Sequence, residues 1–294
     1  MKPLFAAVVA LHVMALLAFT ADKGESVAIA PKQVIHLVNG SPDCLAQFDT
    51  WIVGHGLNND PERVFRMGKD AEGRPLLRVT GHGYGGLITK RSYRDYRLVV
   101  EFRWTGQTSG KREKKARDNG LLLHCTGRPG NCVTSAKAKF TGKFESPWMK
   151  GVELQIIEGG VGDILVLGGW MEDGTFSPTT LRARFSKDRD GEPVFDKNAE
   201  LRPFEAFRLN WWGRDPDWKD EIGFRGKQDV ESPMGKWTRV EAVVRGGDFT
   251  YFVNGTLVNE AKDCSMTEGR ILIQTEDAEI LFRKIDLEPL KATP

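Results

Sequence analysis

The sequence has little of several features that define common protein classes. Its 294 residues carry a net charge of only +2, which gives no basis for nucleic-acid binding. One local basic cluster, Lys111 to Arg117, contains an acid and lies between strand-like segments, so we expect a solvated loop there rather than a polyanion site. Only four cysteines occur and none forms a close CxxC pair, which disfavours a thiolate metal site. Internal repeats and linker-like segments are also lacking, which predicts one domain.

Long apolar runs are missing except near the N-terminus. There an apolar segment from Leu4 to Phe19, interrupted by His12, follows Lys2 and ends near small residues at Ala21. This pattern is typical of a signal peptide and is short for a membrane span. We therefore predict an exported protein, periplasmic or secreted, without a membrane span. The expected divisions are a signal peptide at 1–21 (cleavage as late as 30), an N-terminal extension at 22–43, one domain at 44–290 and a tail at 291–294.

The cysteines suggest disulfides. An even number of cysteines in an exported protein favours a disulfide framework. Cys125 and Cys132 flank a short loop containing Gly and Pro, and a Cys125–Cys132 bond would staple that loop. The remaining pair, Cys44–Cys264, would then tie the N-terminal region to a late loop.

Strand signals dominate after Val64, and helix signals are scarce. Short apolar and β-branched segments alternate with Gly, Asp and Asn turns, and Asn254–Gly255 suits a type I′ hairpin. Residues 168–236 are rich in Gly, Pro, Asp and Trp, and we expect long ordered loops there. The pattern predicts an all-β fold, either a sandwich or a jelly roll. The predicted strands are 76–80, 86–89, 96–104, 120–125, 152–158, 164–167, 237–245, 248–253, 256–259, 270–275 and 279–287.

The segment Gly151-Val-Glu-Leu-Gln-Ile-Ile-Glu158 combines an apolar strand pattern with acidic residues. Glu153 and Gln155 fall on one face, because side chains alternate across a sheet. Glu158 would point the other way unless a β-bulge at Ile156–Ile157 brings it round. Two adjacent carboxyls on a sheet are typical of sugar-cleaving enzymes. A solvated strand face that ends at Gly159–Gly160 is the alternative.

Several motifs occur together in a recognisable order. They are Tyr84-Gly-Gly-Leu-Ile-Thr-Lys90, Tyr93-Arg-Asp-Tyr96, Glu101-Phe-Arg-Trp104, Ala116-Arg-Asp-Asn-Gly-Leu-Leu-Leu-His124, Trp148-Met149, Gly151 to Gly160, Arg214-Asp-Pro-Asp-Trp218, Gly223-Phe-Arg-Gly226, Val253-Asn-Gly255, Ile273-Gln-Thr-Glu276 and Phe282-Arg283. Over residues 45–290 the chain resembles the 3-keto-disaccharide hydrolase domain family, formerly a domain of unknown function in exported bacterial proteins. The chain departs from the family pattern at His124, where other polar residues are frequent, and at Asp277, where Gly is usual.

The resemblance implies a concanavalin A-like jelly roll of two packed antiparallel sheets with a ligand groove on its concave face. It also implies cleavage of glycosides oxidised to a ketone at C3. Such a ketone acidifies the C2 proton, so the C1 substituent can leave by elimination and water can add afterwards. This chemistry requires a general base, a donor or cation for the enolate, and an acid for the departing oxygen.

Glu153, His124 and Glu158 are the predicted catalytic residues. Glu153 would be the essential acid or base, because it lies mid-strand, and Glu158 would join it if the bulge exists. His124 would be a base, or it would bind a divalent metal together with Glu153 to stabilise the enolate. A partly exposed histidine at a strand end is the structural alternative.

The predicted substrate-binding residues are Gln155, Glu101, Arg103, Trp148 and Trp170. Gln155 would bond sugar hydroxyls, and the two indoles would stack on sugar rings. Glu101 and Arg103 share a face, where a cross-strand ion pair is an equal alternative. Gln274 and Glu276 also share a face, although an exposed edge strand would explain them as well.

Two other functions compete with keto-sugar cleavage. Glu153-Leu-Gln-Ile-Ile-Glu158 parallels the Glu-x-Asp-x-x-Glu strand of laminarinase-type retaining β-glucanases, which share the fold, but Gln155 stands where those enzymes have an Asp. A non-catalytic carbohydrate-binding module would also fit the scaffold, because function lies in the site rather than the fold. The sequence predicts a carbohydrate ligand in every case and leaves the oligomeric state open.

Overall fold

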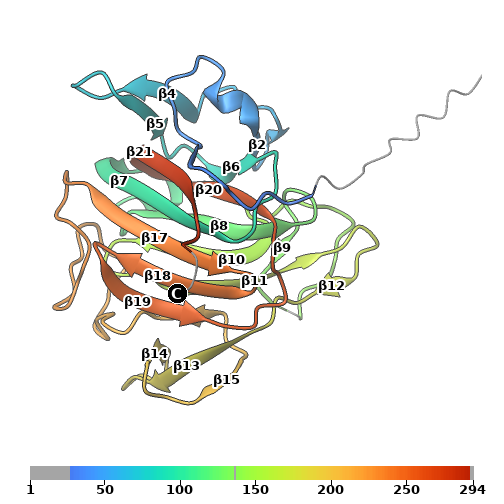
Figure 1. Ribbon diagram of the computed structural model, residues 1–294, viewed down its shortest axis with the longest axis vertical. Coiled ribbons are helices and arrows are strands. Elements are labelled where there is room, and N and C mark those ends of the chain that lie inside the picture. Colours follow the sequence, from blue (N-terminus) through green and yellow to red (C-terminus); the bar gives the residue numbers. More distant parts are fainter. Residues whose placement is uncertain (1–26, 136, 292–294) are drawn as a thin grey trace, which may run out of the picture.

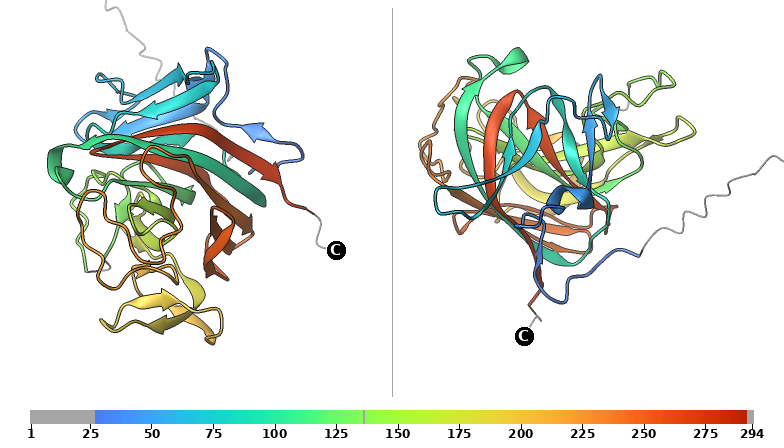
Figure 2. Two further views of the ribbon diagram at one scale, coloured as in Figure 1. Left: turned by 90° about the vertical axis from the view of Figure 1, so that its left-hand side faces the viewer. Right: turned by 90° about the horizontal axis from the view of Figure 1, so that it is seen from above.

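Two large antiparallel sheets pack face to face and account for most of the protein (Figures 1 and 2). The computed structural model describes residues 27–135 and 137–291, so the predicted signal peptide at 1–21 lies outside the described residues. The described chain contains 21 strands and two short 3-10 helices, η1 (Cys44–Gln47) and η2 (Gly110–Arg112), and no α-helix. The predicted all-β sandwich of two antiparallel sheets is confirmed. None of the helices in this part of the chain is long and apolar enough to cross a bilayer.

One large sheet has eight strands. In spatial order they are β19 (Thr256–Ala261), β18 (Asp248–Val253), β17 (Thr238–Arg245), β7 (Tyr96–Thr108), β21 (Ala278–Pro289), β5 (Pro75–Val79) and β4 (Phe65–Lys69), with β1 (Ile35–His36) also paired to β21. The hairpin between β18 and β19 turns at Asn254 and Gly255, whose φ angles are 47° and 81°. Two positive φ angles are required by a type I′ turn, and the predicted hairpin is confirmed.

The other large sheet has ten strands. In spatial order they are β12 (Phe176–Ser177), β11 (Ile164–Trp170), β10 (Lys150–Ile157), β8 (Asp118–Thr126), β20 (Arg270–Glu276), β6 (Tyr84–Thr89), β2 (Phe48–Ile52) and β3 (Gly56–Leu57), with β9 (Cys132–Val133) and β16 (Arg208–Leu209) also paired to β11. Strands β8, β10 and β20 lie side by side at its centre although they are far apart in the sequence.

The segment 168–236, predicted to consist of loops, contains strands as well. A separate three-stranded sheet of β14 (Pro193–Phe195), β13 (Leu181–Lys187) and β15 (Leu201–Phe204) projects at the bottom of Figure 1. Its pattern escaped detection because Leu181 and Ala183 are buried while the intervening Arg182 and Arg184 are exposed, a short alternation hidden among charged residues. Outside this sheet, the end of β11 and the short strands β12 and β16, the prediction of long loops is correct.

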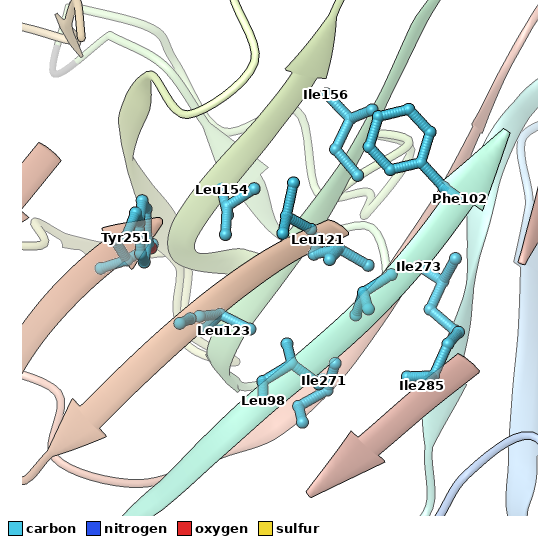
Figure 3. Close-up of a cluster of buried hydrophobic side chains, with 14 of the residues drawn as sticks. Leu98, Phe102, Leu121, Leu123, Leu154, Ile156, Tyr251, Ile271, Ile273 and Ile285 are labelled. Carbon is cyan, nitrogen blue, oxygen red and sulfur yellow. The ribbon is translucent and has the colours of Figure 1, made fainter. Parts of the chain in front are cut away.

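The main core fills the space between the two sheets (Figure 3). Leu121, Leu154 and Ile273 on the ten-stranded sheet face Leu98 and Phe102 on the eight-stranded sheet. Because side chains alternate along each strand, the intervening residues of β8, β10 and β20 lie on the outer face of the ten-stranded sheet. A second, smaller apolar cluster occupies part of that outer face; it contains Ile88, Leu122, Cys125, Cys132, Met149, Leu167 and Leu272.

The predicted disulfides are not formed. Cys44, Cys125, Cys132 and Cys264 are all free and buried. Cys125 and Cys132 instead pack in the small outer cluster, and the Cys44 thiol points to the carbonyl of Leu37 at 3.4 Å. The prediction treated an even number of cysteines as pairs, whereas here each thiol behaves as a small apolar side chain.

Candidate active site

Polar side chains form a row across the outer face of the ten-stranded sheet. Residues paired on adjacent strands point to the same face. Glu153 pairs with Leu122 and Ile157 with Asp118, and Leu272 on β20 pairs with Leu122 on its other side. The set that we call the polar row consists of Asp118 on β8, Glu153 and Gln155 on β10, and Gln274 and Glu276 on β20. The predicted shared face of Glu153 and Gln155 is confirmed.

Glu153 lies at the centre of the polar row and is only 2% exposed. Its carboxylate sits above Gly120 and accepts a hydrogen bond from Nε2 of Gln274 at 2.9 Å. Burial, and then the charge of Asp118, raise the pKa of Glu153 to about 8. A carboxyl group in this environment holds its proton near neutral pH and can act as a general acid.

Asp118 and Glu276 share the guanidinium of Arg112. Arg112 lies 3.1 Å from Asp118 and 3.7 Å from Glu276, and it also contacts Asp220 at 2.7 Å. Burial raises the pKa of Asp118 to about 6 although Arg112 opposes the shift, and burial together with Asp118 raises the pKa of Glu276 as well. Near neutral pH the row therefore offers a carboxylate at Asp118 and a protonated acid at Glu153 on the same face of the sheet.

A second cation approaches the polar row from the other side. Leu165 on β11 pairs with both Glu153 and Arg208, so Arg208 shares the outer face. Its positive charge lowers the pKa of both Asp118 and Glu153, in opposition to burial. Arg208 is oriented by Asp163, which is fully buried and lies 3.4 Å away. Arg112 and Arg208 thus bracket the carboxyls.

Gly120 leaves the space that Glu153 occupies. A Cβ atom at this position would come within 2.1 Å of Oε1 of Glu153 and 2.7 Å of Oε1 of Gln274. The variant Gly120→Ala should therefore displace both side chains and reduce activity strongly, with an overpacking cost of about 1–3 kcal/mol in unfolding free energy. Steady-state kinetics and urea unfolding measure the two effects. Gly68→Ala controls for the loss of glycine itself, because Gly68 is a strand glycine without a positive φ and its added Cβ would meet its nearest atom at 4.0 Å. Full activity in Gly120→Ala would contradict this geometry.

The prediction that Glu158 joins Glu153 is wrong. The pairing of β10 with β8 runs without a shift from Val152 to Ile157, so no bulge turns Glu158 to the outer face. Its carboxylate instead binds the guanidinium of Arg117 at 2.6 Å and accepts hydrogen bonds from the backbone amides of Arg117 and Gly223. Glu158 therefore anchors a loop, and the acid pair that a laminarinase-type mechanism requires is not formed.

The prediction that His124 shares a site with Glu153 is also wrong. The imidazole ring is fully buried between the sheets, with its ring centre 5.7 Å from that of Tyr96 and 5.2 Å from that of Phe249. The shift in strand pairing occurs here, opposite Gly151, and His124 has a φ of 53°. A bulge at this position turns the side chain inward. Burial lowers the pKa of His124 to about 4, so the ring stays neutral.

The divalent metal predicted at His124 and Glu153 does not fit these positions, because the two side chains lie on opposite faces of the sheet. Among residues 27–135 and 137–291, no group of three or more His, Cys, Asp or Glu side chains is placed to hold a metal ion.

Glu101 and Arg103, predicted to bind substrate, lie on β7 of the other sheet. Glu101 pairs with Arg283 at 2.5 Å and Arg239 at 3.3 Å, which is the cross-strand ion pairing given as the alternative. The Arg103 guanidinium stacks on Trp237, 4.7 Å from its ring centre. Both residues belong to a charged face of the eight-stranded sheet, not to the polar row.

The two predicted stacking tryptophans differ in their surroundings. Trp148 is half-buried and lies 6.3 Å from Tyr84, centre to centre, and Tyr84 pairs with Glu276 of the polar row. Trp170 packs against Phe140 at 5.4 Å at the far end of β11. Because Trp148 lies near this end of the polar row, its stacking on a sugar remains a prediction. Trp170 makes no contact with the carboxyl groups of the row in the described part of the chain.

Sequence reasoning missed Asp118, Arg112 and Arg208. Asp118 begins a strand whose centre is uniformly apolar. Whether Asp118 shares a sheet face with Glu153 depends on which strands are adjacent in the sheet, and one strand's pattern does not show this. Arg112 belongs to the basic cluster predicted to be solvated, yet it is 9% exposed and turned toward the polar row. The alternation of Gln274 and Glu276 was a usable signal, but β20 is a central strand rather than the exposed edge considered for it.

Three solved structures with a similar fold are distantly related to this chain. A protein assigned to the glycosyl hydrolases from Parabacteroides distasonis is 14% identical, with 88% of this chain and 94% of that chain covered and a TM-score of 0.44. A carbohydrate-binding module from Bacillus subtilis is 11% identical, covering 76% and 91%, with a TM-score of 0.36. A family 16 endo-glucanase from Bacteroides ovatus is 9% identical, covering 78% and 86%, also with a TM-score of 0.36. At these levels the similarities carry no argument about function.

Comparison of the sequence with protein families is more informative about this chain than the similar structures are. No curated protein matches the chain significantly. Residues 34–288, nearly all of the described sandwich, match the family of 3-keto-alpha-glucoside-1,2-lyase-like domains. This match agrees with the resemblance seen in the sequence motifs and supports a carbohydrate-active protein. The chain belongs to the 3-keto-alpha-glucoside-1,2-lyase-like domain family.

Proposed function

We propose that the protein is an exported enzyme that cleaves 3-keto-glycosides, including 3-keto-disaccharides, by elimination across C1 and C2 followed by hydration. The observation that carries the proposal is that Asp118 and Glu153 are both buried on one face of the sheet, where their pKa values are raised to about 6 and about 8, so that near neutral pH the first is ionised and the second is protonated. The family match supports the substrate class.

In the proposed reaction Asp118 is the base and Glu153 the acid. The Asp118 carboxylate removes the C2 proton, and the electron pair of the C–H bond forms the enolate of the C3 ketone. The C1–O bond then breaks as a C1–C2 double bond forms, and Glu153 gives its proton to the departing oxygen. Water adds at C1 of the resulting enone, its proton returns to Glu153, and Asp118 returns a proton to C2, which restores both groups.

Other residues in and around the polar row would support this reaction. Arg208 is a cation with partial solvent access beside the two carboxyls and would stabilise the negative charge that develops on the enolate oxygen. Gln155 donates a hydrogen bond to Asp118 and Gln274 to Glu153, so the amides hold both carboxyls in place. Trp148 and Tyr84 would support the sugar ring at the β6 end of the row.

A comparison of substrates tests the proposal. The purified protein is incubated with a 3-keto-glucoside, with the same glucoside before oxidation, and with β-1,3/1,4-glucan, and released sugars are measured. We expect release from the 3-keto compound alone. Release of glucose from unoxidised glucan with the keto compound untouched would overturn the proposal in favour of a conventional glucanase. Binding of sugar without cleavage of any of the three would instead identify a binding module.

A further inference from the structure

A single residue, Asp277, joins the two large sheets beside the polar row. It lies between Glu276, the last residue of β20, and Ala278, the first residue of β21, and it is 6% exposed. Its φ is 51°, and the chain passes here from the ten-stranded sheet into the eight-stranded sheet. The proposed reaction gives this buried carboxyl no role, although its neighbour Glu276 belongs to the polar row.

The carboxylate of Asp277 caps the short helix η2. Its Oδ2 accepts a hydrogen bond from the backbone amide of Lys111 at 2.9 Å. Ser109 is the N-cap residue of η2, but its hydroxyl contacts the Asp277 carbonyl at 3.5 Å rather than a helix amide. Gly110 leaves space for the carboxylate, because a Cβ there would come within 2.5 Å of Oδ2. Asp277 therefore supplies the acceptor that an N-cap side chain normally provides, and it holds η2 in place.

Helix η2 carries Arg112, whose guanidinium reaches the polar row. Nε and Nη2 of Arg112 donate to the carbonyl of Ala116 at 2.9 and 2.8 Å, just before Asp118 in the chain. Nη1 lies 3.1 Å from Asp118 and 3.7 Å from Glu276. Because a planar fork that is fixed at two nitrogens directs the third, the position of η2 determines where this cation meets the Asp118 carboxylate.

We propose that Asp277 and Arg112 form a positioning relay for the catalytic base: Asp277 holds η2, and η2 holds the Arg112 guanidinium against the Asp118 carboxylate. Both residues act through Asp118 and take no part in making or breaking bonds. The relay keeps Asp118 ionised and oriented in a buried site, where burial favours the protonated form. It rests on the proposed function only in naming Asp118 as the base, because the contacts themselves do not depend on the reaction.

The relay and the charge of Asp277 have opposite effects on Asp118. Burial raises the pKa of Asp118, and Arg112 and then Arg208 oppose that shift, so displacement of Arg112 should raise the pKa further. Loss of the negative charge of Asp277 by itself would lower the pKa, because a like charge nearby disfavours a carboxylate. The charged and titratable groups that face Asp118 are Arg112 of η2, Asp220 of the following loop region, Glu276 of β20, Glu153 of β10, Arg208 of β16 and Tyr84 of β6.

Titration of the Asp118 carboxyl, followed by carbon NMR, tests the relay without any substrate. Asp277→Gly removes the cap but leaves a residue that adopts the positive φ without strain. We expect the midpoint of Asp118 to move upward by about one pH unit or more in this variant and in Arg112→Gln. Asp277→Asn keeps an acceptor oxygen for η2 and loses the charge, so it should titrate as the parent does or lower. Asp263→Gly, at an exposed Asp with a φ of 52°, is the control for the exchange itself and should titrate as the parent does.

The double variant shows whether Asp277 acts through Arg112. If it does, Asp277→Gly combined with Arg112→Gln should give the same Asp118 midpoint as Arg112→Gln alone. Arg112→Lys, which keeps the charge but not the fork, replaces Arg112→Gln if that variant does not fold, and it should also move the midpoint upward. The relay is overturned if Asp277→Gly titrates as the parent does or lower, or if its effect adds to that of the Arg112 variant.

The pH dependence of cleavage separates the relay from the proposed reaction. If Asp118 is the base, the acidic limb of kcat/KM for a 3-keto-glucoside should move upward with the carboxyl midpoint in Asp277→Gly. A limb that stays in place while the midpoint moves would support the relay and remove Asp118 as the base. A parent protein that cleaves no keto-glycoside would overturn the proposed function, and the carboxyl titration would still decide whether the relay exists.

Discussion

Replacement of Glu153 by glutamine is expected to lower kcat on a 3-keto-glucoside by about 10²–10⁴-fold, the usual contribution of a general acid or base. The amide has the same shape and remains beside Gln274, but it carries no titratable proton. Steady-state kinetics on the purified variant measure the effect. Glu101→Gln is the control, because Glu101 lies on the other sheet in an ion pair with Arg283, and its kcat should match the parent. Normal turnover in Glu153→Gln would remove Glu153 from the mechanism.

The same variant should change how stability depends on pH. The pKa of Glu153 is raised from 4.5 to about 8 by burial, so the folded state binds a proton that the unfolded state releases between these values. The stabilisation by the protonated group is therefore fully present below pH 4.5 and is lost as the pH rises to about 8, by an amount on the order of a few kcal/mol. Urea unfolding across this range should show a smaller decline for Glu153→Gln than for the parent.

Glu158→Gln should give the opposite signature, a large loss of stability with little effect on catalysis. The Arg117–Glu158 ion pair is 2.6 Å long and both side chains are less than a tenth exposed. Removing one partner of a buried pair leaves the other charge uncompensated, and this typically costs about 3–5 kcal/mol in unfolding free energy. Urea unfolding measures the loss, and kinetics below the transition measure turnover.

An exposed pair provides the matched control for Glu158→Gln. Glu172 lies 3.4 Å from Arg128, and both side chains are more than half exposed. Glu172→Gln should change the unfolding free energy by about 1 kcal/mol at most, because solvent screens the pair. If Glu158→Gln abolished turnover while its stability stayed at the parent's value, Glu158 would be a catalytic residue as the sequence pattern first predicted.

The alternation of side chains along a single strand explains which features of the site could be predicted from the sequence. The period of two placed Glu153 with Gln155, and Gln274 with Glu276, on shared faces, and the structure keeps both pairs together. The Asn254–Gly255 turn was equally predictable, because positive φ angles at two successive residues require such a dipeptide. Each of these features depends only on residues close together in the chain.

The rest of the site depends on strand order and on bulges, which single-strand patterns do not contain. Asp118 shares a sheet face with Glu153 because β8 pairs with β10, and β20 completes the row because it pairs with β8. The bulge predicted at Ile156–Ile157 occurs instead at His124. As a result, neither side chain reaches the predicted site. His124 turns into the core, and Glu158 turns to Arg117. The family's usual Gly at Asp277 is explained by a φ of 51° there, a turn geometry that glycine adopts without strain.

The fate of the C2 hydrogen tests the central claim most directly. The parent enzyme is incubated with a 3-keto-glucoside in deuterated water, and early product is analysed by NMR against an enzyme-free control that measures spontaneous exchange next to the ketone. Proton removal by Asp118, exchange of that proton with the solvent before it is returned, and later hydration predict deuterium at C2 of the released sugar in step with cleavage. Cleavage that leaves the original hydrogen at C2, and that is not slowed when C2 of the substrate carries deuterium, would contradict elimination and would indicate direct hydrolysis.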